Sequence, residues 1–266
     1  MPRPSSDAGL ATNLQEMKLI LQSLSDEYFL NMKETTTQKR DILLLNVYYD
    51  LNFLFQFVDT SRIADTSLRM AQITLSNGLC CMSPLAFAEI SLVFVNMRDN
   101  AENITLGYRV GTIALRLLNK IDAIRYTSAV IAIVGGLISW VAEPLQSIAE
   151  SHLLGYDYGQ RNGDIVSGRL NYQFYVLINF VSGQNLADCR DKSREFAHEL
   201  LRCKQQFILR GTWTIYLQAV AFIEGIDVNA EEEDGSNKLF TWDNITDGAH
   251  QDFLVGKYLM VVVHNL

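Results

Sequence analysis

Apolar residues recur along most of this 266-residue chain at spacings of three, four and seven, which is the period of an amphipathic helix. Around residue 110, one stripe of the expected helix contains Tyr108, Gly111, Leu115 and Leu118, and the opposite stripe contains Arg109, Thr112, Arg116 and Lys120. Pro84 follows Ser83, which favours a helix start because serine can cap a helix and proline is tolerated in its first turn. The pattern predicts an all-α protein.

Turn signals between the apolar runs divide the chain further. One helix is expected to stop at Asn162 and Gly163, and Asp164 is expected to cap the next. The expected helices cover residues 10–32, 38–58, 61–77, 84–97, 107–120, 123–141, 144–161, 164–181, 186–203, 207–225 and 249–266. We therefore expect a disordered tip (1–9), N-terminal helices (10–82), a helical repeat array (83–225), an acidic loop (226–247) and the start of a further, truncated helix (248–266).

The expected helices form pairs that repeat. The text Gly-Tyr-Arg-Val-Gly at 107–111 recurs as Gly-Tyr-Asp-Tyr-Gly at 155–159, in the second helix of each pair. Helix pairs of roughly 34 to 47 residues are typical of tetratricopeptide-like α-solenoids. Small residues such as Gly111, Ala114, Gly155 and Gly159 are expected to let neighbouring helices approach closely. The strict tetratricopeptide consensus is absent, so the sequence predicts antiparallel pairs stacked as a degenerate α-solenoid.

Two stretches are apolar on every side. Residues 42–57 carry Leu, Val, Tyr and Phe on nearly every face, so we expect that helix to be buried. An uncharged stretch begins at Tyr126 and ends at Ala142, between Arg125 and Glu143. A membrane span needs about 20 predominantly apolar residues, and this stretch contains serine, threonine and glycine. A buried central helix is the favoured interpretation, and membrane association is the alternative.

Composition narrows the classes of function. Hydrophobic residues make up 48% of the chain and charged residues 20%, which excludes a disordered protein. Only four prolines occur, and two of them, Pro2 and Pro4, lie in the tip, which fits a body of uninterrupted helices. The net charge of -8 and the scattered basic residues argue against a nucleic-acid partner, because phosphate binding needs a basic face.

Four cysteines occur, of which Cys80 and Cys81 are adjacent and Cys189 and Cys203 are distant. They form neither a Cys-x-x-Cys motif nor a disulfide framework, and residues 1–10 lack the apolar core of a signal peptide. We therefore expect reduced thiols in a cytoplasmic protein. A cysteine nucleophile paired with a histidine stays open, although an inert thiol is the simpler interpretation.

Motifs for catalysis are missing from the sequence. It contains no phosphate-binding loop, kinase motif or G-x-S-x-G nucleophile motif, and its histidines at 152, 198, 250 and 264 lack zinc spacing. The acidic run at 231–234 does not alternate as a calcium loop does. We predict no catalytic, cofactor or metal residue. The alternative is an all-helical enzyme with a dispersed site near His152, the one ionisable residue on an apolar stripe.

Several segments resemble the helical region of very large multi-sensor serine/threonine or histidine kinases that carry a predicted AAA ATPase, known from cyanobacteria, fungi and diatoms. The segments are SPLAFAEISLVF (83–94), GYRVGTIALRLL (107–118), WVAEPLQSIAESHLLGYDYGQRNGD (140–164), LNYQFYVLINFVSGQNLAD (170–188), TWTIYLQAV (212–220) and, preceding them, MKETTTQKRDILLLNVYYDLNFLFQFVDT (32–60). The resemblance implies that ATP binding and kinase activity belong to other domains of such proteins. It implies a fragment of a larger protein, since the chain stops within an expected helix.

The expected function is that of a non-catalytic scaffold or regulatory segment in signal transduction. Its partner would be a protein, either the ATPase and kinase domains or a peptide in the concave face of the solenoid. Candidates for solvent or partner contact are Arg109, Thr112 and Arg116 in one repeat and Glu150, Asp157 and Arg161 in the next. Aromatic residues that could line a peptide groove, or simply pack between helices, are Tyr172, Phe174, Tyr175, Phe180, Trp213 and Tyr216.

Overall fold

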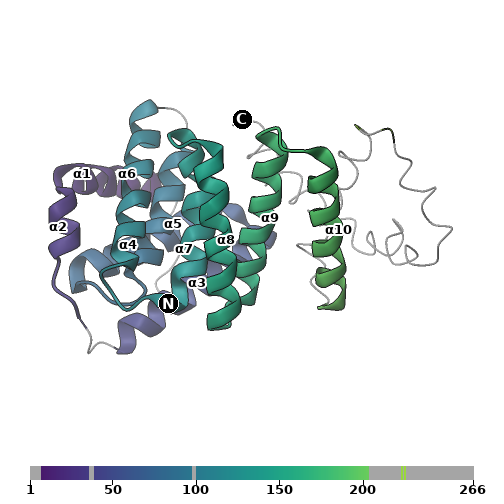
Figure 1. Cartoon of the computed structure of the whole chain (residues 1–266). Helices are drawn as coiled ribbons and strands as arrows, with labels where there is room; N and C mark the ends of the chain where they lie inside the picture. Colours follow the sequence, from purple (N-terminus) through teal and green to yellow (C-terminus); the bar gives the residue numbers. More distant parts are fainter. Residues whose placement is uncertain (1–6, 36–38, 98–99, 204–222, 224, 226–266) are drawn as a thin grey trace. The chain divides into compact units, whose positions relative to one another are not determined.

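The computed structural model describes residues 7–35, 39–97 and 100–203, together with Ile223 and Gly225. Within these residues the chain forms ten α-helices and three short 3-10 helices and contains no strand, so the predicted all-α class is confirmed (Figure 1). The expected elements at 226–247 and 248–266 lie outside the described residues, as does the one at 207–225 apart from Ile223 and Gly225. Trp213, Tyr216, the acidic run and the histidines at 250 and 264 also lie outside them.

The chain divides into two compact units. One comprises Met1–Pro144 and Leu154–Asn171, and the other comprises Leu145–Leu153 and Tyr172–Leu266. Helices α8 (Leu145–Asn162) and α9 (Ile165–Val181) therefore contribute residues to both. The first unit thus contains the expected N-terminal helices and the first part of the expected array.

The first unit opens with two helices where the sequence predicted one. Helix α1 (Asp7–Ser23) begins within the expected disordered tip, and α2 (Asp26–Asn31) follows after a break. Ser25 causes the break, because its hydroxyl accepts a hydrogen bond from the backbone N–H of Tyr28 at 3.1 Å and so caps a new helix. The prediction of one helix over 10–32 was therefore wrong.

Helices α3 (Lys39–Val58) and α4 (Ile63–Asn77) pack against each other and match the predicted helices at 38–58 and 61–77 closely. A 3-10 turn, η1 (Thr60–Arg62), connects them. The loop after α4 begins at Gly78, whose φ of 95° and close approach to the Lys33 carbonyl oxygen exclude a side chain. The backbone N–H of Leu79 donates to that oxygen at 2.8 Å.

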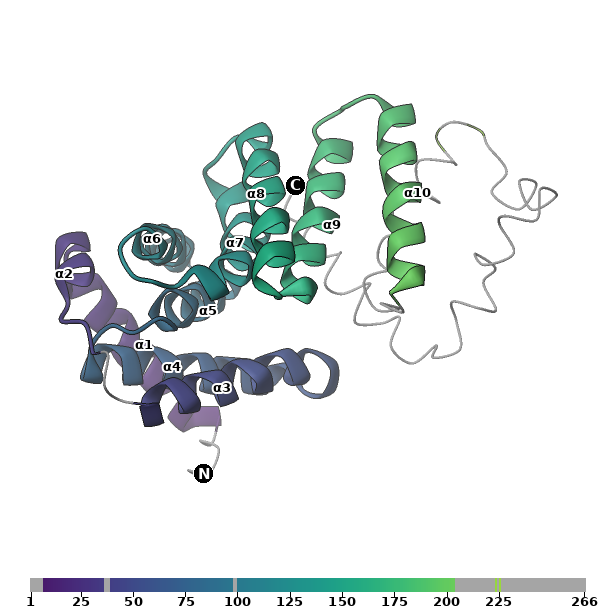
Figure 2. The same cartoon turned by 60° about the horizontal axis from the view of Figure 1, so that its bottom comes forward.

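The centre of the first unit is α5 (Ser83–Asn96), which is buried along nearly its whole length. It contacts α4, α6 (Ala101–Leu118) and α7 (Thr127–Leu137) (Figure 2). Pro84 lies in its first turn, as predicted. A Cβ atom added to Gly107 of α6 would lie 2.6 Å from the backbone oxygen of Ser91. The repeated glycine motif thus lets α6 approach the backbone of α5.

The expected helix at 123–141 does not form one continuous α-helix. It contains η2 (Ile124–Tyr126), α7 (Thr127–Leu137) and η3 (Ser139–Val141), with a break at Ile138 that the sequence did not predict. Among the described residues, Ile124–Val141 is the one helical stretch long and apolar enough to cross a bilayer, and 72% of it is buried inside the protein. Packing against α5 and α6 supports the interpretation as a core helix.

Helix α8 ends at Asn162, and Gly163 adopts a left-handed φ of 79°, which confirms the predicted stop. Beyond this turn, a Cβ on Gly159 would lie 2.5 Å from the Cα atom of Gly168, so α8 and α9 meet backbone to backbone there. The predicted close approach through Gly159 is confirmed.

The second unit is described through the first turns of α8, the second half of α9 and α10 (Leu186–Arg202). Within it the rings of Tyr172 and Phe196 lie 4.6 Å apart, and Phe174 is buried. Cys189, Phe196 and Leu200 are buried along one side of α10, as its apolar spacing predicted. Here Tyr172 packs against Phe196 of α10 and Phe174 packs against His152 of α8, which fits the simpler of the two interpretations that the sequence allowed.

Candidate functional site

Helix α3 buries Leu45 and the polar Asn52 on its inner side but leaves several apolar residues exposed on its outer side. The side chains of Leu43, Leu54 and Val58 are 65%, 55% and 82% exposed, whereas Asn52 on the opposite side is 1% exposed. The prediction that this helix is buried on all sides was therefore wrong for its outer face. A solvated helix face normally carries charged and polar residues, so the outer face of α3 is unusual.

The outer face has regular spacing. Leu43, Val47, Asp50 and Leu54 follow one another at intervals of four, three and four residues, which is the spacing of the contact seam between two packed helices. Asp50 is exposed at the middle of this series. We call these positions, with Val58 at their end, the α3 seam. Its spacing is visible in the sequence, but its exposure is not.

A buried polar cluster holds the inner face of α3. The Asn52 side-chain amide donates to the hydroxyl of Ser67 on α4 and to the carboxyl of Glu89 on α5, each at 3.0 Å. Thr66 donates its hydroxyl proton to the Asn52 side-chain oxygen. Because a buried amide is costly without partners, these bonds fix the rotation of α3 and thereby leave the seam outside.

Burial raises the pKa of Glu89 to about 7, against the opposing effect of hydrogen bonds from Asn52 and Ser67. Burial also raises the pKa of Tyr49, with smaller contributions from the negative charges of Asp164 and Glu89. The groups that hydrogen-bond Glu89 are neutral, so they compensate only part of the cost of burying its charge. The cluster therefore favours a protonated carboxyl below neutral pH.

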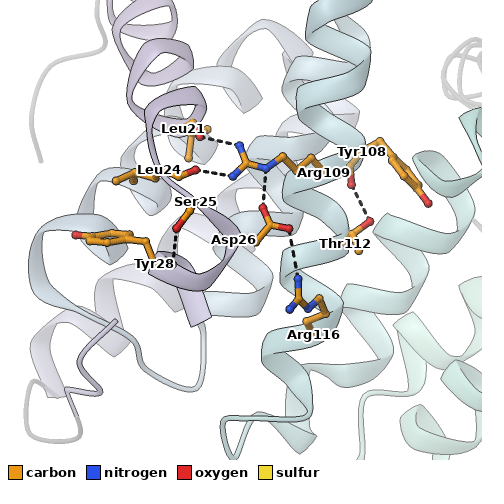
Figure 3. Close-up of polar contacts among 9 residues, drawn as sticks. All are labelled: Leu21, Leu24, Ser25, Asp26, Tyr28, Tyr108, Arg109, Thr112 and Arg116. Atoms are coloured by element: carbon orange, nitrogen blue, oxygen red, sulfur yellow. Dashed lines mark hydrogen bonds and ion pairs between the residues drawn. The ribbon is translucent and has the colours of Figure 1, made fainter. Parts of the chain in front are cut away.

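The predicted polar stripe of α6 contacts the chain's own N-terminal helices (Figure 3). Arg109 donates to Asp26 at 2.7 Å and to the backbone oxygens of Leu21 and Leu24 at 3.2 and 2.5 Å, and Arg116 reaches Asp26 at 3.4 Å. The two carbonyl groups stand at the end of α1, where helical hydrogen bonds run out. The expectation that Arg109 serves solvent or partner contact is therefore wrong.

The remaining members of the predicted stripes make local contacts or are exposed. The Thr112 hydroxyl donates to the Tyr108 backbone oxygen at 3.0 Å, within the same helix. Arg161 and Asp157 form an exposed ion pair at 2.8 Å, four residues apart on α8. Glu150 is exposed. Exposed pairs of this kind contribute little stability, so α8 shows an ordinary solvated face at these positions.

The enzyme alternative depends on His152. This side chain is fully buried in the second unit, and its ring stacks on Phe174 with centroids 5.2 Å apart and planes 29° apart. The alternative requires acidic or histidine side chains gathered around it. Over 7–35, 39–97 and 100–203, no group of three or more His, Cys, Asp and Glu side chains is placed to hold a metal ion. The contact of His152 that the structure shows is thus the stacking of its ring on Phe174.

The four cysteines are free thiols, with Cys189 buried, Cys203 exposed and the adjacent pair partly exposed.

Comparison with known proteins adds no relative: neither a protein-family model, nor a curated protein, nor a solved structure matches the chain. The function is therefore inferred from the residues of this chain alone. The exposed apolar side chains of the α3 seam are the surface feature that most needs an explanation.

Proposed function

We propose that this chain is a non-catalytic helical scaffold that binds a helix of a partner protein on the α3 seam. The observation that carries the proposal is the exposed apolar face of α3, with Leu43 and Leu54 outside and Asn52 hydrogen-bonded inside. Full burial of a leucine or valine contributes about 1.5–3 kcal/mol. Covering Leu43, Leu54 and Val58 would contribute roughly 3–6 kcal/mol before the costs of association are subtracted.

The seam favours a different protein over a second copy of this chain. Asp50 lies near the centre of the seam, so both parallel and antiparallel pairing of two α3 helices would bring the two Asp50 carboxylates together. Like charges at a shared position oppose such pairing. A partner helix with leucines at the matching positions and one central lysine or arginine would complement both the apolar surface and the charge.

The wider setting in the proposal is an ATPase–kinase signalling protein of the cytoplasm, with the partner helix on its ATPase or kinase domain. The resemblance of the segments at 83–94, 107–118 and 140–164 supports this setting. The stacked α-solenoid belongs to the same proposal. It is supported by contacts between consecutive helices, α3 with α4, α4 with α5, α5 with α6 and α6 with α7.

A designed peptide tests the binding surface. The probe is a fluorescent 20-residue amphipathic helix with leucines along one seam and one central lysine, and its binding to the full chain is measured by fluorescence anisotropy. Leu54→Arg should weaken binding at least tenfold, because it places a charge in the apolar contact. Leu19→Arg is the matched control, since Leu19 on α1 is 58% exposed and lies outside the seam.

Reversing the charge of the peptide or of Asp50 provides a second test of binding at the α3 seam. A peptide with a central aspartate should bind the native chain more weakly than the lysine peptide, and Asp50→Lys should reverse that preference. Equal effects of Leu54→Arg and Leu19→Arg would contradict the proposal. So would a dimer of the native chain that Leu54→Arg dissociates, or peptide binding that appears only after residues 204–266 are removed, because another occupant would then cover the seam.

A further inference from the structure

A second feature, independent of the α3 seam, lies in the loop between α4 and α5. Cys80 and Cys81 are adjacent in this loop and both are partly exposed, while Leu79 and Met82 on either side are fully buried. The backbone of Leu79 is held at both its polar groups, since its N–H donates to Lys33 and its carbonyl accepts from Thr35 at 2.7 Å. The two thiols are thus presented on an anchored segment.

The Cys80 sulfur lies at the start of α5. The Cys80 backbone N–H donates to the Ser83 hydroxyl at 2.9 Å, and the Ser83 backbone N–H donates to the Cys80 carbonyl at 2.9 Å. The Ser83 hydroxyl in turn donates toward the Cys80 sulfur at 3.8 Å. The first turn of a helix has unpaired N–H groups and a partial positive charge, and this environment stabilises a thiolate.

The neighbouring groups act in the same direction. The hydrogen bond from the Cys81 thiol, more than any other contact, lowers the pKa of Cys80 to about 6; burial opposes this, and the backbone of Met82 together with Ser83 assists it. The same hydrogen bond raises the pKa of Cys81, as do burial and the Asp122 carboxylate. Tyr126 also faces the pair, but its hydroxyl donates to Asn46 at 3.2 Å.

An internal disulfide is not the natural product of this pair. Consecutive Cα atoms are about 3.8 Å apart, whereas disulfides usually join Cα atoms that are about 4.4–6.8 Å apart. A bond between Cys80 and Cys81 would therefore be strained. A mixed disulfide on Cys80 avoids this strain, and Cys81 remains as the hydrogen-bond donor beside it.

We propose that Cys80 is a redox-modification site that forms a mixed disulfide with low-molecular-weight disulfides such as oxidised glutathione. The Cys80 thiolate attacks one sulfur of the small disulfide, a new protein–sulfur bond forms, and the old sulfur–sulfur bond breaks. The other half leaves as a thiolate and takes a proton from water. Cys80 is oxidised and one half of the small disulfide is reduced, so atoms and electrons balance.

The most specific expectation concerns the pH dependence of the reaction rate of Cys80 relative to that of an ordinary thiol. At pH 6 a thiol with a pKa of about 6 is half ionised, while an ordinary thiol with a pKa of about 8.5 is ionised to about 0.3%. A less basic thiolate is intrinsically about tenfold less reactive. The net advantage of Cys80 over an ordinary thiol is therefore about tenfold at pH 6 and about twofold at pH 7, and it is reversed at pH 8.

The experiment uses the full chain with oxidised glutathione at pH 6, 7 and 8, and peptide mass mapping measures the rate at each cysteine. A short peptide with one cysteine serves as the ordinary thiol, and Cys203 is the exposed control thiol within the chain. We expect Cys80 to react about tenfold faster than the peptide at pH 6, and its rate to change with a midpoint near pH 6.

Two variants separate the role of Cys81. Cys81→Ala should move the midpoint upward and slow the reaction at pH 6 several-fold, whereas Cys81→Ser keeps a hydrogen-bond donor and should retain most of the rate. A Cys80 midpoint near pH 8.5, a Cys203 rate equal to that of Cys80 at pH 6, or an internal Cys80–Cys81 disulfide as the main product would overturn the proposal. The native chain alone decides these outcomes if a variant fails to fold.

Discussion

The buried carboxyl of Glu89 makes the stability of the first unit depend on pH. The pKa of Glu89 is about 7 in the folded chain and about 4.3 in an unfolded chain. At pH values between these two pKa values the folded chain binds more protons than the unfolded chain. The free energy of unfolding therefore falls as the pH rises from about 4 to 7. Below this window the carboxyl is protonated in both states, and above it the cost of burying the charge is complete.

Replacement by glutamine isolates this effect. Glu89→Gln keeps a neutral hydrogen-bonding group beside Asn52 and Ser67 but cannot ionise. From the two pKa values, the native chain should lose about 2.5 kcal/mol between pH 5 and pH 8 relative to Glu89→Gln. The variant should consequently be the more stable protein at pH 8.

Urea unfolding at both pH values, followed by circular dichroism, measures the difference. Hydrogen exchange of the α5 amides assigns it to the first unit. Glu150→Gln is the control, because Glu150 is exposed and its replacement should leave the pH dependence unchanged. If Glu89→Gln and the native chain show the same pH dependence, the carboxyl is not held protonated and the account of the buried cluster is wrong.

Two further predictions concern the packing of α6. Arg109→Ala should lower stability by about 1–2 kcal/mol and speed hydrogen exchange in α1 and α2, because it removes bonds to Asp26 and to the end of α1; unchanged exchange there would contradict this role. Gly107→Ala should cost about 1–3 kcal/mol, since the new Cβ would lie 2.6 Å from the Ser91 oxygen. Thermal melting measures this cost, with Thr105→Ala on the exposed side as its control.

Local signals in the sequence predicted several elements well. Pro84 marked the start of α5 and Gly163 the end of α8, because both act through the backbone dihedral angles of their own residues. The break at Ser25 was missed, although serine is a strong capping residue. The apolar pattern continues through that position in the sequence and therefore favours one uninterrupted helix. In the structure Ser25 caps a second helix despite this pattern.

The surfaces were harder to predict than the helices. The sequence places Arg109 on a polar stripe, but it cannot show that Asp26 and the end of α1 return to meet that stripe from more than 80 residues away. It also places Cys80 beside Cys81, whereas the approach of Ser83 to the sulfur depends on how the loop enters α5. Contacts between distant elements determine both environments.

By itself, the sequence determined the all-α class and the main turn positions, since these depend on periodicity and on single backbone conformations. Only the tertiary structure decided which face of α3 is exposed. Its sequence is apolar on nearly all sides, so no stripe indicates an inside. The buried hydrogen bonds of Asn52 to Ser67 and Glu89 turn the polar residue inward, because those groups would lose their partners in any other rotation of the helix.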